Sequence, residues 1–311
     1  GLGNMGQHHA KAYTRLDQVD FVSACDPHPE RFESVETQES TQYFSDIHKM
    51  LASVDIDAVS ICVPTSMHYE VAKLCMDHNI CVLVEKPIAE SVSQAKLLVQ
   101  HAKDQGVLLT VGHIERFNPA VLKAKDFVSS GTLGDIHAIQ CKRYGPFPKQ
   151  IKDANVLVDV AVHDIDIVQF LLQVPVVESK VFTHHVHSKD RADTGHVMLT
   201  FEPNIMVNIH VSWAFPYKQR EVEIIGSKGV ALVDCIAQSM TVYPVDIQVT
   251  PDEIYLPLAD GECIEINKKE PIIEECRAFV DAVLHKTAPF ICPEQATEAL
   301  HLALLNGVGR R

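Results

Sequence analysis

Three glycines open the chain in a GxGxxG pattern, Gly1, Gly3 and Gly6, ahead of a helix-like stretch that ends near Arg15. Asp26 lies 20 residues beyond Gly6, at the end of the apolar run VDFVSACD. In dinucleotide-binding folds such a turn brings backbone N–H groups to a pyrophosphate, and an acid at this distance binds the ribose hydroxyls. The candidate residues of the turn are Gly1, Gly3, Asn4, Met5 and Gly6.

The acid at position 26 also bears on the choice of cofactor. A carboxylate there repels the 2′-phosphate of NADP, and no arginine follows it immediately, so the sequence favours NAD. Arg31 lies five residues further on and could still pair with a phosphate. NADP therefore stays open as the less favoured cofactor.

A lysine closes the next chemically informative segment. Lys86 stands between Glu85 and Pro87, directly after the apolar run CVLV. In a doubly wound sheet ligands bind at the carboxyl ends of the strands, so Lys86 is expected where cofactor and substrate meet. The alternative is a surface lysine whose stem covers apolar neighbours.

The segment DVAVHDID carries one histidine and several acids. Asp159 and His163 are four residues apart and Asp166 follows three later, so a helix would place both acids on the histidine's face. An acid so placed orients an imidazole and stabilises its protonated form. A surface ion pair and a metal site are the alternatives, but one histidine with two acids lacks the usual third strong zinc ligand. No metal is predicted.

Two of these residues are candidates for the base of a proton transfer. A free lysine has a pKa of about 10.4 and is almost always charged at neutral pH, whereas imidazole, near 6.5, is mostly neutral. His163 is therefore predicted as the base and Lys86 as an electrostatic and positioning partner. Burial can lower a lysine pKa by several units, so Lys86 stays open as the alternative base.

The elements that must position these residues differ between the two parts of the chain. Up to about residue 115, strand-like runs alternate with helical segments, among them one with a Ser91 and Gln94 capping pattern and a stop at Gly106. This alternation predicts an α/β, Rossmann-type doubly wound parallel sheet. The strand that should precede Gly1 is missing from this sequence, so the sheet is expected to lack a central strand.

The later part is dominated by strand-like runs, with turn signals at 202–204 and 226–229 and helices near 156–172, 271–285 and 293–305. It predicts an α+β domain with a large, mostly antiparallel open-faced sheet. We therefore expect an NAD-binding domain at 1–117 and a substrate-binding and oligomerisation domain at 118–311.

Composition excludes several classes of protein. The chain has 311 residues, 46% hydrophobic and 22% charged, as expected of a folded globular protein. Its net charge of −14 has the wrong sign for binding nucleic acid or an anionic membrane. Nine scattered cysteines without a CxxC pair, and no signal peptide or apolar membrane span, predict a cytoplasmic protein with reduced thiols.

Together these motifs resemble the glucose-fructose oxidoreductase and inositol dehydrogenase family (Gfo/Idh/MocA). The resemblance rests on GLGNMG, CDP at 25–27, VPTSMH at 63–68, EKP at 85–87 and DVAVHDID. It implies oxidation of a sugar or cyclitol hydroxyl with NAD(P). The residues it carries over are Lys86, Asp159 and His163 as catalytic, and Pro64, Thr65, His68 and Glu85 beside the cofactor.

Within the family, VGHIERFNPAV, RYGPFPK and DVAVHDIDI resemble the UDP-N-acetylglucosamine 3-dehydrogenases. A local basic cluster is compatible with a diphosphate substrate: Lys142, Arg143, Lys149 and Lys152. Arg143 and Lys149 are accordingly candidate substrate-binding residues with Lys86 and His163, although a solvated strand edge accounts for the cluster equally well.

Three functions follow as hypotheses. The first is oxidation of a sugar, with the 3-hydroxyl of a UDP-N-acetylhexosamine as the favoured group, and the second is oxidation of inositol or another sugar. The third is a non-catalytic NAD-binding sensor, which would need only the glycine turn and Asp26. The open face of the large sheet must be covered, so a homodimer or homotetramer through that sheet is expected.

Overall fold

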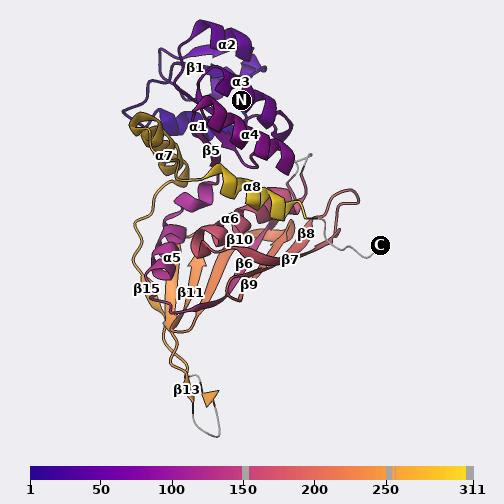
Figure 1. The fold of residues 1–311 in the computed structure, drawn as a ribbon, viewed down its shortest axis with the longest axis vertical. Helices are drawn as coiled ribbons and strands as arrows, with labels where there is room; N and C mark the ends of the chain where they lie inside the picture. Colours follow the sequence, from indigo (N-terminus) through magenta and orange to yellow (C-terminus); the bar gives the residue numbers. More distant parts are fainter. Residues whose placement is uncertain (149–153, 250–253, 256, 306–311) are drawn as a thin grey trace. The chain divides into compact units, whose positions relative to one another are not determined.

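The computed structural model describes residues 1–148, 154–249, 254, 255 and 257–305 (Figure 1). The chain forms two compact units. The first contains Gly1–Ile114 and Glu270–His301, and the second contains Glu115–Lys269 and the chain from Leu302 onward. The division after Ile114 lies close to the predicted one at 117. Residues 270–301, assigned from the sequence to the second domain, belong instead to the first unit.

The first unit is built from short parallel strands and helices. Its strands are β1 (Ser23–Cys25), β2 (Gln42–Phe44), β3 (Ala58–Ile61), β4 (Cys81–Glu85) and β5 (Leu109–Gly112). Its α-helices are α1 (Asn4–Tyr13), α2 (Ile47–Ser53), α3 (His68–Asp77), α4 (Val92–Gln105), α7 (Pro271–His285) and most of α8 (Pro293–Ala303). Two 3₁₀ turns, η1 (Pro29–Ser34) and η2 (Thr65–Met67), complete this unit, and a third, η3 (Ile114–Phe117), begins at its last residue and continues into the second unit.

All strand pairs of this unit are parallel, in two separate ladders. One ladder joins β1 to β2, and the other has the order β3-β4-β5. The middle strand β4 is buried between its neighbours, which is why CVLV is apolar throughout rather than alternating. The predicted parallel α/β architecture is confirmed, and the sheet is divided between β1 and β3.

Local signals set the ends of α4 as predicted. The Ser91 hydroxyl accepts a hydrogen bond from the Gln94 N–H, and Gly106 ends the helix in the left-handed conformation with φ of 67°. A non-glycine residue at such a φ would bring its Cβ against the backbone.

The C-terminal helix α7 belongs to the first unit because it packs against α1. Ala12 and Leu16 form a buried cluster with Cys276 of α7. Thr110, in β5, donates a hydrogen bond of 2.9 Å to the carbonyl of Ile291. Packing between segments this far apart in the chain leaves no signal in the local sequence pattern.

The second unit is built on an eight-stranded sheet with the order β15-β12-β11-β10-β6-β9-β8-β7. Of these pairs only β6–β9 is parallel, so the mostly antiparallel sheet is confirmed. Its strands are β6 (Ile136–Pro146), β7 (Val176–His184), β8 (Thr194–Phe201), β9 (Ile205–Ser212), β10 (Ala214–Gly226), β11 (Gly229–Asp234), β12 (Ser239–Pro244) and β15 (Glu262–Ile264), with a separate pair β13 (Gln248–Val249) and β14 (Ile254–Tyr255).

The two faces of this sheet differ in burial. Helices α5 (Pro119–Ser129) and α6 (Val162–Leu172) lie on one face (Figure 1), where side chains such as Val197 and Ile209 are fully buried. The opposite face leaves Met198 48% and Met206 65% exposed.

All nine cysteines are free thiols, as expected. Among the described residues no helix is long and apolar enough to cross a membrane.

Candidate active site

The glycine turn is held together by close backbone contacts. A Cβ added to Gly6 would lie 1.9 Å from the Gly1 carbonyl oxygen, and one added to Gly1 would lie 2.6 Å from the carbonyl oxygen of Cys62. Both positions therefore require glycine. A Cβ added to Gly3 would meet nothing within 4 Å. The turn is packed on one side and open at Gly3.

The open side of the turn leads to the N-terminus of α1. Gly3 is the N-cap, no side chain caps the helix, and its first turn contains no acid. The helical hydrogen bonds begin with Gln7, whose N–H donates to the Gly3 carbonyl. The backbone N–H groups of Asn4 and Met5 precede that bond and carry the positive end of the helix dipole. This arrangement fits the pyrophosphate of a dinucleotide.

Asp26 ties the glycine turn to the end of β1. Its carboxylate accepts hydrogen bonds from the N–H of Leu2 at 2.6 Å, from the N–H of His28 at 2.9 Å and from Arg31 at 3.0 Å. Burial by itself raises the pKa of Asp26, but the two N–H groups and the guanidinium outweigh it and lower the pKa below its usual range. The carboxylate is charged, as recognition of ribose hydroxyls requires.

Arg31 determines access to that carboxylate. Asp26 is 1% exposed, and Oδ2 already accepts both the Leu2 N–H and the Arg31 guanidinium. Oδ1 accepts only from the His28 N–H among the described contacts and retains a lone pair for a hydroxyl. The Arg31 side chain is 42% exposed. It can therefore swing outward to admit a ribose.

The predicted loop beside the cofactor lies at the carboxyl end of β3. Pro64 is exposed and Thr65 half-buried, and both are in or next to η2. His68 is buried, with Nδ1 2.7 Å from the Pro87 carbonyl oxygen and Nε2 3.0 Å from that of Val63. Its ring therefore holds this loop against the segment that follows Lys86, and its place beside the cofactor stays a prediction.

Lys86 follows β4 at the same edge of the ladder, half-buried, with a cis peptide bond to Pro87. The preceding carboxylate fixes its backbone, because Glu85 Oε2 accepts the Lys86 N–H at 3.1 Å. Because β3 and β4 are parallel neighbours, the glycine turn beside Cys62, the Pro64 loop and Lys86 share one edge. This is the edge at which α/β sheets bind ligands.

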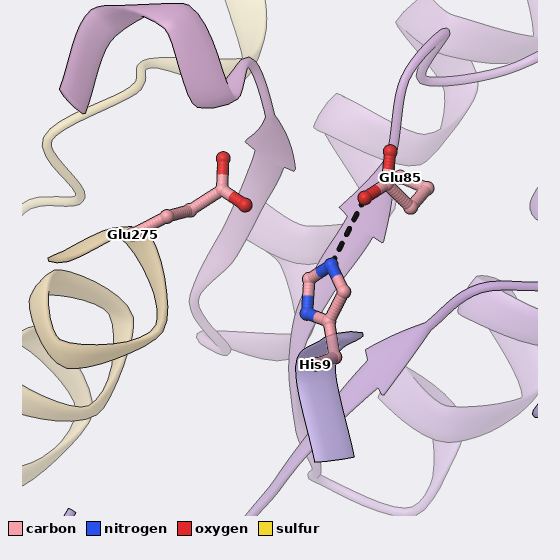
Figure 2. Close-up of side chains that lie close together, drawn as sticks. All are labelled: His9, Glu85 and Glu275. Carbon is pink, nitrogen blue, oxygen red and sulfur yellow. Dashed lines mark hydrogen bonds and ion pairs between the residues drawn. The ribbon is translucent and has the colours of Figure 1, made fainter. Parts of the chain in front are cut away.

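A buried histidine that sequence reasoning missed supports this strand end. His9 Nε2 lies 2.9 Å from Glu85 Oε1, and Glu275 of α7 points toward the pair (Figure 2). Burial works against a charged His9, yet the thiols of Cys62 and Cys276 and the Glu85 carboxylate raise its pKa well above the usual value. Burial likewise raises the pKa of Glu85, but His9 and Lys86 lower it by more than burial raises it. The pair is therefore an imidazolium and a carboxylate.

One ligand atom from each of His9, Glu85 and Glu275 lies within 4.8 Å of the others, a spacing that could hold a metal ion. The imidazolium already supplies positive charge between the two carboxylates. The sequence signal for this cluster is weak: His9 lies on the face of α1 that also carries Tyr13, four residues later. Glu85 binds both His9 and the Lys86 N–H, and its predicted contact with the cofactor stays a prediction.

In the second unit His163 lies in the first turn of α6, and Asp159 lies in a π-helical turn at Leu157–Ala161 that precedes it. Both side chains are half-buried. The sequence predicted one regular helix. A π-turn has i→i+5 hydrogen bonds, so residues four apart are not stacked as they are in a regular α-helix. Such turns occur frequently at functional sites.

Asp166, the second acid predicted to lie on the His163 face of the helix, is bound by an arginine. Asp166 is fully buried and binds Arg116 with two hydrogen bonds of 2.9 and 2.7 Å. The bidentate geometry is that of a structural ion pair. Spacing within the helix could not reveal this pair, because Arg116 is 50 residues away in the chain.

The structure also argues against the predicted basic cluster. Arg143 is 5% exposed, and its guanidinium binds Asp164 and Glu115, both buried. Burial raises the pKa of Asp164 more than Arg143 lowers it, whereas Glu115, also beside Arg220, has a lowered pKa despite its burial. An arginine held between two carboxylates is not available to a diphosphate.

Of the remaining members of the cluster, the structure describes only Lys142. Lys142 pairs with Glu223 at 2.5 Å across the sheet. Lys149 and Lys152 lie outside the described residues.

Comparison with known proteins identifies the family. The model of the oxidoreductase family with an NAD-binding Rossmann fold matches residues 1–113, and that of the GFO/IDH/MocA C-terminal domain matches residues 121–232. The chain belongs to the Gfo/Idh/MocA oxidoreductase family. The resemblance read from the sequence is confirmed, and this family member is an NAD-binding oxidoreductase.

Relatives of this Gfo/Idh/MocA protein are named as dehydrogenases of different substrates. It is 25% identical over 283 residues to the UDP-N-acetylglucosamine 3-dehydrogenase of Acidithiobacillus ferrooxidans, covering 91% of this chain and 87% of that protein. It is 24% identical over 314 residues to the myo-inositol 2-dehydrogenase of Thermotoga maritima, covering 97% of this chain and 92% of that protein.

Solved structures share the fold along almost the whole chain. The structure of the same Acidithiobacillus ferrooxidans enzyme has a TM-score of 0.84 at 24% identity and covers 98% of this chain and 93% of that one. GenD2 from gentamicin A biosynthesis, solved in complex with NAD, has a TM-score of 0.82 at 21% identity. The match covers 97% of this chain and 90% of that one.

Proposed function

We propose that this protein oxidises a sugar hydroxyl and transfers the hydride to NAD. The observation that carries this proposal is Lys86, anchored through Glu85 at the same strand edge as the glycine turn. A sensor that only binds NAD needs the turn and Asp26 but has no use for an anchored lysine at that edge. Bound NAD supplies the acceptor for the hydride that leaves the carbon.

The remaining chemistry belongs to the protein. As the carbon gives up its hydride, the hydroxyl loses a proton, and His163 is the proposed base that accepts it. Asp159 stabilises the imidazolium that forms, and the Lys86 ammonium donates a hydrogen bond to the substrate oxygen as negative charge develops on it. The chain's π-turn before His163 supports an active role for this segment.

The proposed substrate is a UDP-N-acetylhexosamine, oxidised at its 3-hydroxyl. Support comes from the likeness to the Acidithiobacillus ferrooxidans enzyme along 91% of this chain. The likeness to myo-inositol 2-dehydrogenase is almost as high and covers more of the chain, which makes inositol the competing substrate. The buried, paired Arg143 takes no part in the choice.

A substrate panel tests the proposal. The protein is incubated with NAD and, separately, UDP-N-acetylglucosamine, other UDP-sugars, inositols and free hexoses, and NADH absorbance is followed. We expect the highest kcat/KM with the UDP-N-acetylhexosamine. A clear preference for inositol would overturn the proposed substrate in favour of inositol. NAD binding without turnover of any substrate in the panel would favour the non-catalytic sensor.

Two substitutions test the proposed roles. His163→Asn should retain NAD binding, lower kcat about 100-fold or more and remove the acidic limb of the pH profile. Lys86→Met should also lower kcat strongly but leave that limb in the residual activity. If the limb survives in His163→Asn and vanishes in Lys86→Met, the two roles must be exchanged.

We also propose that the exposed face of the large sheet pairs with a second copy of the chain in a homodimer or homotetramer. Large apolar side chains gather on its strands, with Phe182 47%, Met198 48% and Met206 65% exposed. Light scattering should show a dimer or tetramer, and Met198→Lys with Met206→Lys should shift it toward monomer. A wild-type protein that is monomeric would contradict this proposal.

We propose that the protein works in the cytoplasm. Its free thiols support a reducing compartment.

A further inference from the structure

The π-turn before α6 is capped by a side chain that the proposed mechanism does not use. Asn155 Oδ1 accepts hydrogen bonds from the N–H of Leu157 at 3.0 Å and from that of Val158 at 3.1 Å. Its backbone carbonyl accepts the Asp159 N–H, also at 3.0 Å. The first N–H groups of a helix have no acceptor within the helix, so an asparagine in this position caps it. One residue thus binds three successive N–H groups, the last of them that of Asp159.

The turn ends on a bond that sets its width. The Val162 N–H donates to the Leu157 carbonyl, five residues earlier, and α6 continues from there as a regular helix. A turn closed by such a bond is wider than an α-turn, so the direction of the Asp159 side chain relative to His163 depends on it. Asn155 holds the N–H of the same residue whose carbonyl accepts this bond.

The sheet anchors the start of the turn. The Val156 N–H donates to the Ala192 carbonyl at 3.1 Å. The Leu157 side chain fills the space that Gly195 of β8 leaves, since a Cβ added to this glycine would lie 2.8 Å from Leu157 Cδ2. The cap formed by Asn155 extends this anchor into the turn itself.

We propose that Asn155 is a positioning residue of the dehydrogenase, whose side chain fixes the π-turn so that Asp159 faces His163. The inference rests on the catalytic roles proposed above for those two residues. When the Asn155 side chain is removed, the N–H groups of Leu157 and Val158 lose their acceptor and the start of the turn frays. Asp159 then turns away from the imidazole. Asn155 acts on the rate through Asp159, and not by binding NAD or substrate.

The other acids of this segment are held in place by their own partners. Asp164 is bound by Arg143, and Asp166 is bound by Arg116. Asp193, on the chain beside the turn, is fully buried, and its carboxylate accepts three backbone N–H groups at 2.7 to 2.8 Å. A change in the titration of His163 on removal of the cap therefore reports on Asp159.

Two substitutions of one residue test the proposal. Asn155→Ala removes the cap, and Asn155→Ser supplies another oxygen of the kind preferred at helix N-caps. Amide hydrogen exchange, read by NMR, should be at least about 10-fold faster at Leu157 and Val158 in Asn155→Ala and close to wild type in Asn155→Ser. With NAD and the preferred substrate, Asn155→Ala should lower kcat about 10- to 100-fold with little change in KM, and Asn155→Ser should restore most of the rate.

The pH profile separates positioning from a general loss of structure. In Asn155→Ala the acidic limb of the kcat profile should move to lower pH, as it should in Asp159→Asn, because the imidazolium loses the carboxylate that faces it. Asn118→Ala is the matched control, because Asn118 caps α5 of the same unit through Oδ1, which accepts the Ala120 N–H at 3.1 Å. It should lower stability but leave kcat, the acidic limb and exchange at Leu157 unchanged.

A titration of the His163 ring by NMR, without substrate, gives an answer that is independent of turnover. The pKa of His163 should be lower in Asn155→Ala than in wild type, and Asn155→Ser should return it toward the wild-type value. If the protein oxidises no substrate, the proposed function fails, and this titration still decides whether Asn155 orients the pair. Faster exchange at Leu157 and Val158 with an unchanged His163 titration would make the cap structural only and overturn the proposal. Equal effects of Asn118→Ala on that titration would overturn it as well.

Discussion

The buried His9–Glu85 pair makes a prediction whose magnitude follows from burial. His9 is 2% and Glu85 7% exposed, with Nε2 and Oε1 2.9 Å apart. Replacing His9 with leucine leaves a buried carboxylate without its cation. Breaking a buried pair from one side costs about 3 to 5 kcal/mol. At about 2 to 4 °C per kcal/mol, His9→Leu should lower Tm by about 6 to 20 °C.

The loss should depend on pH in a defined way. The pKa of His9 is raised above its usual 6.5, so its contribution is complete below pH 6.5 and is lost as pH rises through the raised value. The pKa of Glu85 is lowered below 4.5, so its contribution is complete above pH 4.5 and is lost as pH falls through the lowered value. The difference between wild type and His9→Leu should therefore be largest between pH 4.5 and 6.5.

Urea unfolding of both proteins from pH 4 to pH 9 measures this difference. His28→Leu is the matched control, because His28 and Glu30 form an exposed pair with side chains 56% and 73% accessible. It should change stability little at any pH. The double variant His9→Leu with Glu85→Gln should recover part of the loss, since no charge is left buried. A loss equal at pH 5.5 and pH 9 would refute the imidazolium–carboxylate pair.

Three further outcomes follow from the structure. Gly6→Ala should destabilise the protein by several degrees in Tm, because its Cβ would lie 1.9 Å from a backbone oxygen, whereas Gly3→Ala should leave Tm unchanged and weaken NAD binding in calorimetry, since its Cβ projects into the open side of the turn. Arg31→Ala should tighten NAD binding about 2- to 10-fold by uncovering Asp26, and unchanged or weaker binding would show that the arginine does not cover the ribose site. Asn118→Ala removes the cap of α5 and a buried bond to the Cys235 carbonyl, and should cost about 1 to 3 kcal/mol in urea unfolding.

Much of this protein could be predicted from patterns that span a few residues. The cap at Ser91 and the stop at Gly106 depend on contacts within one turn of the chain, and the close approach of Gly6 to Gly1 spans only five residues. The alternation of strands and helices up to residue 114 likewise reflects local periodicity, which is why the α/β class followed from the sequence. The family followed from the same short motifs.

Only the tertiary structure decided which charged side chains are free to act. Arg143 and Asp166 have the residue types and spacing of a substrate site, yet their partners Asp164 and Arg116 bury them. His9 is hydrogen-bonded to Glu85, which is 76 residues away in the chain, and helix α7 packs in the first unit although it lies near the other end of the sequence. Periodicity assigns a residue to a face of its own element. It cannot name the residue that packing places opposite, because that partner depends on how distant elements fold together.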